Sequence, residues 1–222
     1  AENKVYVGGA FSGDLGGPAY LWEYNCASKK WSRIDDDVHD GSMHLVVDEA
    51  RGLLWSKTLY AFYSRDLTDA NSFWVMRINE SLDGGDWLLY NATSVYHVSE
   101  NKILIMGANK SIIYDVSDIE NVIRTDVKTW NGDGASFINS NAPGLAYDNS
   151  NNDIVGWNGG VLLSIIDINS QSITIENPSS NNQIVPTEAN AHGTYGRFQY
   201  SDKYNVFIGV NGIDEAVYFY KR

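Results

Sequence analysis

Short apolar runs separated by polar turns follow one another along the whole chain. In the first of them, residues 2–4 form a polar turn, residues 5–7 an apolar strand, and Gly8 and Gly9 follow. The same order of turn, apolar strand and a closing glycine or tryptophan recurs four more times. The first apolar residue of each copy falls at positions 5, 53, 103, 154 and 206, so successive copies are 48, 50, 51 and 52 residues apart. Self-similarity at such a regular spacing is typical of repeat architectures.

Further strands accompany each copy of this cassette. A strand precedes four copies (44–48, 95–99, 144–148, 197–201), a third follows (21–25, 74–79, 112–115, 164–167, 218–220), and most units add a fourth (30–34, 86–90, 122–127, 172–176). β-branched and aromatic residues dominate these runs, and no segment keeps a 3.6-residue apolar period long enough for a helix.

Four short antiparallel strands in about 50 residues make the blade of a β-propeller. We therefore predict an all-β fold: a single β-propeller domain over residues 1–222, with about five four-stranded blades. The repeat units are residues 1–38, 39–90, 91–139, 140–190 and 191–222. The alternative is a β-sandwich whose periodicity is accidental.

The two terminal units are incomplete in this interpretation. The first begins at its second strand, and the last stops after its third strand. Three explanations stay open: five blades of which two are incomplete, four blades with extra strands, or part of a longer or multi-chain propeller. In the last case a second copy or a partner chain would complete the terminal blades by strand pairing.

The first unit carries the pattern of a known repeat. Gly8-Gly9, Tyr24 and Trp31 resemble the double glycine and the spaced tyrosine and tryptophan of the kelch repeat. Partial matches are Gly159-Gly160 with Ile166-Asp167 and Gly107 with Tyr114-Asp115. The chain is thus similar to kelch-like and galactose-oxidase-type propellers. The resemblance implies the fold and no particular activity, because propellers serve many functions.

Composition narrows the class of partner. The chain of 222 residues has 16 Lys plus Arg against 28 Asp plus Glu, a formal net charge of −12. This surplus argues against nucleic-acid binding, which needs clustered cations. No window of 18 residues is apolar throughout, so we expect no membrane span.

Several features favour a secreted, extracellular glycoprotein. Asn79, Asn91 and Asn109 each begin an Asn-x-Ser/Thr acceptor sequence for N-glycosylation. The chain starts without methionine, which suits a product from which a leader has been removed. Cys26 is the single cysteine, so no internal disulfide forms, and a core of this size needs none.

The segments that lead into the innermost strands are the candidate site, because propellers usually bind ligands there. They cover residues 38–44, 90–95, 140–145 and 192–197 and contain three of the four histidines. The candidate ligand-binding residues are His39, Asp40, His44, Asn141, His192, Tyr195 and Arg197. The alternative is that these polar groups hydrogen-bond one another and hold the blades together.

Two loops carry the oxygen donors that calcium prefers. One contains Asp35, Asp37 and Asp40, and the other contains Asn131 and Asp133. Neither matches the twelve-residue EF-hand pattern, and ordinary surface turns are the alternative. The histidines lack the spacing of a zinc site, and we expect no cofactor other than a structural calcium ion.

Three functions fit these features. The first is a non-enzymatic, secreted binding module that recognises carbohydrate or a protein at the cell surface. The second is a carbohydrate-active enzyme, a hydrolase or polysaccharide lyase, with His44, His192, Tyr195 and Arg197 as its site. The third is a structural subunit that assembles by strand pairing. No serine-hydrolase, nucleotide-binding or dinucleotide-binding motif is present, which favours the first.

Overall fold

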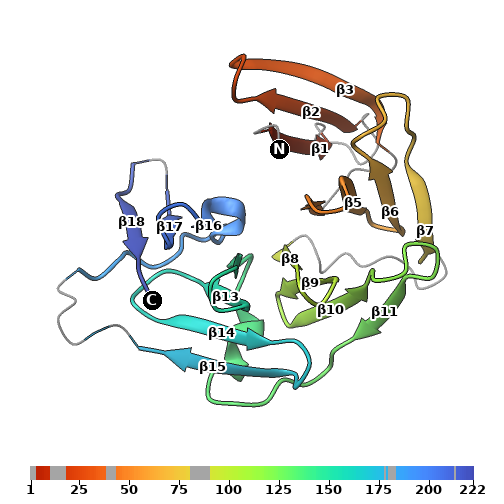
Figure 1. The fold of residues 1–222 in the computed structure, drawn as a ribbon. Helices are drawn as coiled ribbons and strands as arrows, with labels where there is room; N and C mark the ends of the chain where they lie inside the picture. The colour runs from red at the N-terminus through yellow and green to blue at the C-terminus, as the bar shows by residue number, and fades with distance from the viewer. Residues whose placement is uncertain are drawn as a thin grey trace. The chain divides into compact units, whose positions relative to one another are not determined.

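The computed structural model describes residues 4–10, 19–38, 44–80, 91–177, 179, 184–212 and 214–222. It is an all-β protein of the β-propeller class, with five antiparallel sheets that serve as blades, so the predicted fold class is confirmed (Figure 1). Each sheet falls within one of the five predicted repeat units. The described residues also include two short 3-10 helices, η3 (Ala135–Asn139) and η4 (Tyr195–Arg197).

The blades follow one another in chain order. Three of them have four described strands and two have three. Blade 1 is β1 (Lys4–Ala10), β2 (Ala19–Asn25) and β3 (Lys30–Val38); blade 2 is β4 (His44–Asp48), β5 (Leu53–Lys57), β6 (Ala61–Asp66) and β7 (Val75–Asn79); blade 3 is β8 (Thr93–His97), β9 (Lys102–Gly107), β10 (Lys110–Asp115) and β11 (Ile123–Asp126); blade 4 is β12 (Gly144–Asp148), β13 (Asp153–Trp157), β14 (Leu163–Asp167) and β15 (Ser172–Glu176); blade 5 is β16 (Phe198–Ser201), β17 (Val206–Val210) and β18 (Val217–Tyr220).

The chain divides into two compact units. Unit 1, Ala1–Trp87, holds blades 1 and 2, and unit 2, Leu88–Arg222, holds blades 3 to 5. In unit 1, Leu21 of blade 1 and Leu54 of blade 2 are fully buried in a shared apolar cluster. Arg65 of β6 donates a hydrogen bond to the carbonyl oxygen of Ile34 in β3, which adds a polar link between these two blades.

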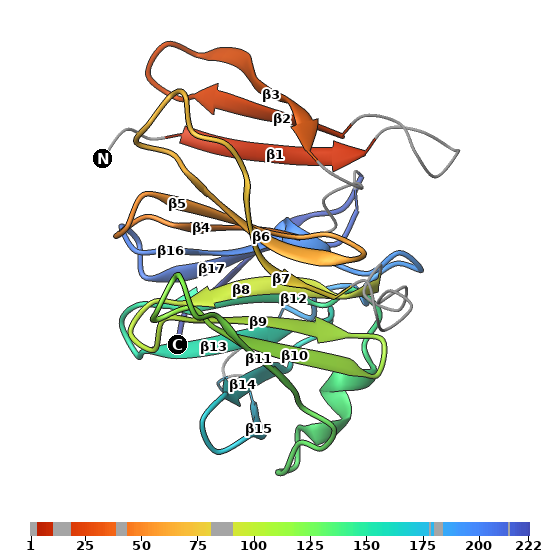
Figure 2. The same cartoon turned by 90° about the vertical axis from the view of Figure 1, so that its right-hand side faces the viewer.

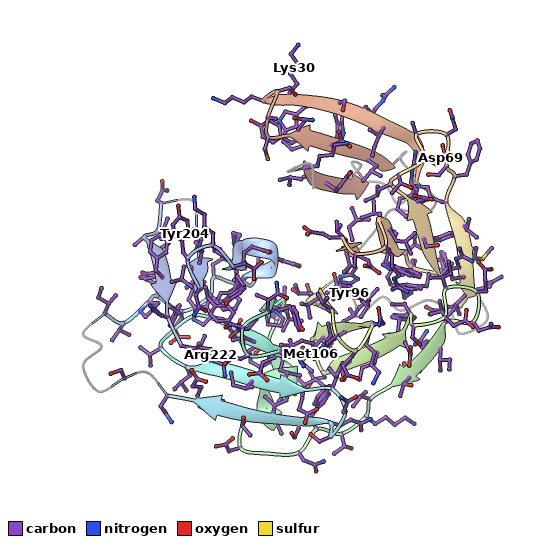
Figure 3. The ribbon with its side chains drawn as sticks, in the orientation of Figure 1. Lys30, Asp69, Tyr96, Met106, Tyr204 and Arg222 are labelled. Carbon is purple, nitrogen blue, oxygen red and sulfur yellow. The ribbon has the colours of Figure 1, made fainter. Side chains whose placement is uncertain are left out.

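In unit 2 the first strand of each blade lies next to the first strand of the neighbouring blade. β12 contacts both β8 and β16, so the three blades share one inner side (Figure 2). One apolar cluster joins blades 3 and 4 and includes Met106, which Figure 3 labels in the crowded centre of the unit. A second cluster joins blades 4 and 5 around Trp157, which packs against Phe198, Tyr218 and Tyr220.

A tyrosine–asparagine pair closes the first hairpin of each blade in unit 2. The tyrosine hydroxyl near the end of the first strand donates to an asparagine side chain five residues later: Tyr96 to Asn101, Tyr147 to Asn152 and Tyr200 to Asn205. All three asparagines have a positive φ, a conformation that asparagine tolerates better than most residues. The same side-chain hydrogen bond is needed at each of these turns, which explains why tyrosine and asparagine recur there in the sequence.

The third strand of blade 2 corrects the sequence interpretation. The prediction assigned residues 74–79 to the third strand, but β6 takes that position and β7 is the fourth strand. The turn before β6 contains no glycine, proline or asparagine. Instead, the hydroxyl of Thr58 accepts hydrogen bonds from the backbone N–H groups of Tyr60 and Ala61. The predicted strand 86–90 lies outside the described residues.

Candidate functional site

In unit 2, the loop that leads into the first strand of each blade is hydrogen-bonded to the corresponding loop of the preceding blade. The backbone N–H of Ala142, before β12, donates to the carbonyl oxygen of Asn91, before β8, at 2.7 Å. The N–H groups of Thr194 and Tyr195, before β16, both donate to the carbonyl oxygen of Ala142 at 2.8 Å. We call these three segments the lead-in loops: residues 91–92, 140–143 and 190–197. Their hydrogen bonds bring three separate parts of the sequence to one end of the inner strands.

Tyr195 occupies the same place in its blade as Ala142 does in the preceding blade. Counting back from the paired tyrosines Tyr147 and Tyr200, the two residues stand five positions earlier, and both have a positive φ, +43° for Ala142 and +49° for Tyr195. This strained backbone conformation is therefore a feature of the docking turn. Alanine adopts this backbone conformation in blade 4, so the phenol ring of Tyr195 is not required for the docking turn.

The lead-in loop of blade 5 lies directly against that of blade 4. The side-chain amide of Asn141 donates to the carbonyl oxygen of Ala191 at 3.0 Å. A Cβ atom at Gly193, which has a φ of +78°, would meet the carbonyl oxygen of Asn141 at 2.2 Å, so the position requires glycine. His192 is exposed, and its backbone N–H donates to the side chain of Asn190. The structure thus brings together Asn141, His192, Tyr195 and Arg197 of the predicted site.

Arg197 fixes the shape of its own loop and still has hydrogen-bond donors to offer. Its Nε donates to the carbonyl oxygen of Thr194 at 3.2 Å, and one Nη donates to that of Gly193. An arginine side chain has five N–H donors, and the described residues accept from two of its three nitrogens. Because the residue is exposed, it provides a cation at this end of blade 5.

The phenol of Tyr195 is a hydrogen-bond donor at neutral pH. Partial burial raises the pKa of Tyr195 above its usual value, which keeps the proton on the hydroxyl. The residue as a whole nevertheless keeps 37% of its surface exposed. The lead-in loop of blade 5 thus carries a phenol and an arginine two residues apart, and the side chain of Asn141 is hydrogen-bonded to the same loop. Such groups are suited to binding a polar ring-shaped ligand.

The other candidate residues lie elsewhere. His44 begins β4 in unit 1, where it is buried and stands opposite Lys57 in the register of β4 and β5. His39 and Asp40 lie outside the described residues. The fourth histidine, His97, is buried against the ring of Tyr147, and burial lowers its pKa.

The calcium candidates are described only in part. Asp35 and Asp37 lie within β3, but their side chains fall outside the described part of the structure. Asn131 bridges to Ser172 through the backbone, and the carboxylate of Asp133 accepts the backbone N–H of Ile175 at 3.0 Å. Among the described residues, no group of three or more His, Cys, Asp or Glu side chains stands close enough to hold a metal ion. Calcium binding stays a prediction.

One contact of the site was not predicted from the sequence. The segment 90–95 was expected to lie at the site, but Asn91 was named only as a glycosylation acceptor, and its carbonyl oxygen receives the lead-in loop of blade 4. No side-chain pattern marks this contact, because it is made entirely by backbone atoms. The signal that was available is the position itself, immediately before a predicted inner strand.

Comparison with known proteins supports the fold alone. No protein-family model and no curated protein matches the chain. Among solved structures, a protein of unknown function from Bacteroides thetaiotaomicron is 16% identical with a TM-score of 0.64, covering 96% of this chain and 58% of that one. The β-propeller domain of Cps50 (Swd1) from Myceliophthora thermophila is 11% identical with a TM-score of 0.50, covering 91% and 57%.

A third similar structure is an auxiliary nutrient binding protein from Bacteroides thetaiotaomicron. It is 12% identical with a TM-score of 0.55, and the match covers 98% of this chain and 51% of that one. The chain therefore spans a little over half the length of these three structures. They place it among β-propellers, whereas the kelch-like resemblance rests on sequence motifs alone. No helix of the described residues is long and apolar enough to cross a membrane.

Proposed function

We propose that the protein is a carbohydrate-binding propeller module whose lead-in loops in unit 2 hold the ligand. The observation that carries the proposal is the comparison of Tyr195 with Ala142. Both residues make the same docking turn, so the backbone geometry does not require an aromatic side chain at Tyr195, and contact with a ligand would account for one. The similar structure described as a nutrient binding protein supports a binding role in general terms.

The chemistry of Tyr195 favours binding over catalysis. A lyase needs a base that takes a proton, and a phenol does so at neutral pH only when its pKa is lowered. Burial shifts the pKa of Tyr195 in the opposite direction. The hydroxyl then donates to a sugar oxygen, the ring packs against the sugar, and Arg197 and Asn141 offer further donors.

Replacing Tyr195 by alanine tests this function. Because alanine already makes the same turn at position 142, Y195A removes the ring and leaves the docking intact. We expect the affinity for a binding polysaccharide to fall at least tenfold, about 1.4 kcal/mol, while the variant keeps its fold. Affinity electrophoresis against soluble neutral β-glucan, xylan and polygalacturonate measures the effect.

A matched control lies in the turn between β16 and β17, at the other end of β16. Tyr204 is 64% exposed, and Figure 3 labels it on blade 5. We expect Y204A to bind like the unchanged protein. Equal losses in both variants, or binding that survives Y195A, would refute the site. Release of reducing sugars or unsaturated products from any of the polysaccharides would show an enzyme instead of a binding module.

Secretion is part of the same proposal. Asn79, Asn91 and Asn109 are all exposed, as glycosylation requires. Digestion of the natural protein with an endoglycosidase should lower its mass. A glycan on Asn91 would stand at the lead-in loops, so the site predicts that Asn91 carries none while Asn79 or Asn109 does.

A further inference from the structure

The carboxylates of unit 2 are unevenly distributed between the two ends of its strands. The lead-in loops lie at one end. The turns that join the second and third strands of blades 3 and 4 return to the same end, because β9 ends beside the start of β8 and β13 ends beside the start of β12. The three lead-in loops and these two turns, residues 107–110 and 157–162, contain no Asp or Glu.

The other end of the same strands is acidic. Asp148 and Asp153 stand opposite each other at the first turn of blade 4, and Asp167 ends the third strand of that blade. Blades 3 and 5 carry Glu100 and Asp202 in their first turns. Each first strand of unit 2 therefore runs from an acid-free loop to an acidic turn.

This contrast does not depend on the undescribed residues. Those of unit 2 are all uncharged (88–90, 178, 180–183 and 213), so every charged side chain of the unit belongs to the described part. Other carboxylates do stand toward the lead-in loops: Glu188 precedes the loop of blade 5, Asp133 accepts a backbone N–H of β15, and Asp214 and Glu215 lie in the turn after β17. The acid-free region is thus the lead-in loops themselves and the two turns beside them.

The side chains that cap the turns differ in the same way. Asp148 and Asp167 each accept the backbone N–H two residues later with a carboxylate oxygen. In the lead-in loop of blade 5, Asn190 accepts the N–H of His192 with an amide oxygen, and its amide nitrogen donates to the carbonyl oxygen of Asn211. Asp and Asn serve such turns equally. The amide closes the turn without adding a negative charge beside the exposed His192.

Arg197 offers a cation in this acid-free region. Its Nε and one Nη donate to the carbonyl oxygens of Thr194 and Gly193, whereas its other Nη donates to none of the described residues. That nitrogen carries two N–H groups, which leaves the outer end of the guanidinium for a further acceptor. A Cβ atom at Gly196 would meet no atom within 4 Å, so the space beside this residue, between Tyr195 and Arg197 in the chain, is open.

We propose that the ligand of the lead-in loops is an acidic polysaccharide and that Arg197 binds its uronate carboxylate; this inference rests on the proposed function and names its ligand class. A carboxylate matches the geometry of a guanidinium. The acid-free loops reduce the repulsion that a chain of net charge −12 exerts on an anion. Tyr195 supplies a ring for the sugar, and a single arginine falls short of the clustered cations that nucleic-acid binding needs.

One polymer in two charge states tests the ligand class. Polygalacturonate and its fully methyl-esterified form have the same sugar backbone, but only the first carries carboxylates. We expect calorimetric titration at low ionic strength to show at least tenfold tighter binding of polygalacturonate than of the methyl ester, neutral β-glucan or xylan. Added salt should reduce this preference, because the charges are exposed.

The outcomes separate this inference from the proposed function. Equal or tighter binding of a neutral polysaccharide would overturn the ligand class and leave the carbohydrate-binding role standing. Binding of none of these polymers would refute the role itself. Polyglutamate presents carboxylates without sugar rings, so competition by polyglutamate as strong as that by polygalacturonate would reduce the site to charge attraction and overturn the proposal.

A pair of charge variants at one exposed residue tests the location without altering Arg197. Ala191 is exposed in the lead-in loop of blade 5, and its contact with Asn141 uses the backbone carbonyl oxygen. We expect A191E to weaken polygalacturonate binding about three- to fivefold and A191K to strengthen it by a similar factor. Neither should change binding of a neutral polysaccharide. A shift in the same direction for both variants would contradict the placement.

A second pair removes one cation from each end of β16. R197Q removes the proposed carboxylate ligand, and K203Q removes an exposed lysine from the turn between β16 and β17. We expect at least a tenfold loss of polygalacturonate affinity in R197Q and none in K203Q. R197K, which keeps the charge but loses the planar fork, should fall between them. Equal losses in R197Q and K203Q would overturn the role of Arg197.

Discussion

Blades 4 and 5 share one repeat pattern but differ in how their third strands are covered. In β14, Leu163, Ser164 and Ile166 are buried, and β15 pairs along the strand's outer side. In β18 the residues alternate between exposed and partly buried, and none is fully buried. The first two strands of both blades pack into the same apolar cluster around Trp157.

The difference teaches that burial of a strand depends on its neighbours as much as on its own sequence. Val217-Tyr218-Phe219-Tyr220 has at least as much β-forming character as Leu163–Asp167, yet among the described residues no fourth strand pairs with it and none of its residues is fully buried. The third strand of blade 4 therefore contributes to the stability of the core, whereas the third strand of blade 5 presents exposed side chains. The following predictions separate these two roles.

The largest expected effect is at Trp157, where the two blades meet. Its ring is fully buried and lies 5.5 Å from Phe198 and 5.7 Å from Tyr220, centroid to centroid. We expect W157A to lower the free energy of unfolding by about 3–5 kcal/mol, measured by urea denaturation. W31A, which removes an exposed ring in blade 1, should cost about 1 kcal/mol. Similar costs for both would show that blade 5 does not depend on this contact.

A smaller effect compares the third strands directly. Ile166 of β14 is 1% exposed, whereas Phe219 of β18 is largely exposed. We expect I166A to destabilise the protein by about 2–4 kcal/mol, because it opens a cavity in the core. F219A should change stability by less than about 0.5 kcal/mol. Thermal denaturation of the two variants side by side provides the measurement, and a large cost for F219A would mean that β18 is covered.

The smallest predicted effect is acid sensitivity at the first turn of blade 4. Asp148 is buried where blade 5 has Ser201. Burial alone would raise the pKa of Asp148, but hydrogen bonds from Asn151 and Ser150 to the carboxylate outweigh it and lower this pKa to about 2. The stabilising effect is complete above the unfolded pKa of about 3.9 and is lost as pH falls through about 2.

We therefore expect D148N to be less stable than the unchanged protein by about 1–3 kcal/mol at pH 7, because it loses hydrogen bonds to a charged group. The gap should narrow as the pH falls from 4 toward about 2, where the native carboxylate takes up its proton. Denaturant titrations at a series of pH values test this. A gap that stays constant over that range would show that Asp148 is not ionised in the folded protein.

The sequence was sufficient for the three blades of unit 2 because each repeat there restates the same turn. The pairs Tyr96–Asn101 and Tyr200–Asn205 place the same hydrogen bond at the same turn, so periodicity in letters reflects periodicity in geometry. β6 was missed because its turn is made by the side chain of Thr58, in place of the glycine or asparagine that marks most turns.

The candidate site could be predicted only as a region. Asn141, His192, Tyr195 and Arg197 were chosen because they precede inner strands, and the structure brings them together. Their docking depends on backbone carbonyl oxygens, which every residue type provides, so no sequence motif could specify it. The last unit was predicted to stop after its third strand, and β18 is the last described strand of blade 5, but the cavity beside it depends on side chains from four separate segments.

Amide hydrogen exchange along β14 and β18 tests the contrast between the two blades most directly. Strand pairing on both sides of β14 should protect its amides uniformly from exchange. In β18 we predict alternation, with slow exchange where the N–H faces β17 and fast exchange where it faces away from β17. Uniform protection along β18 would contradict this contrast between the two strands.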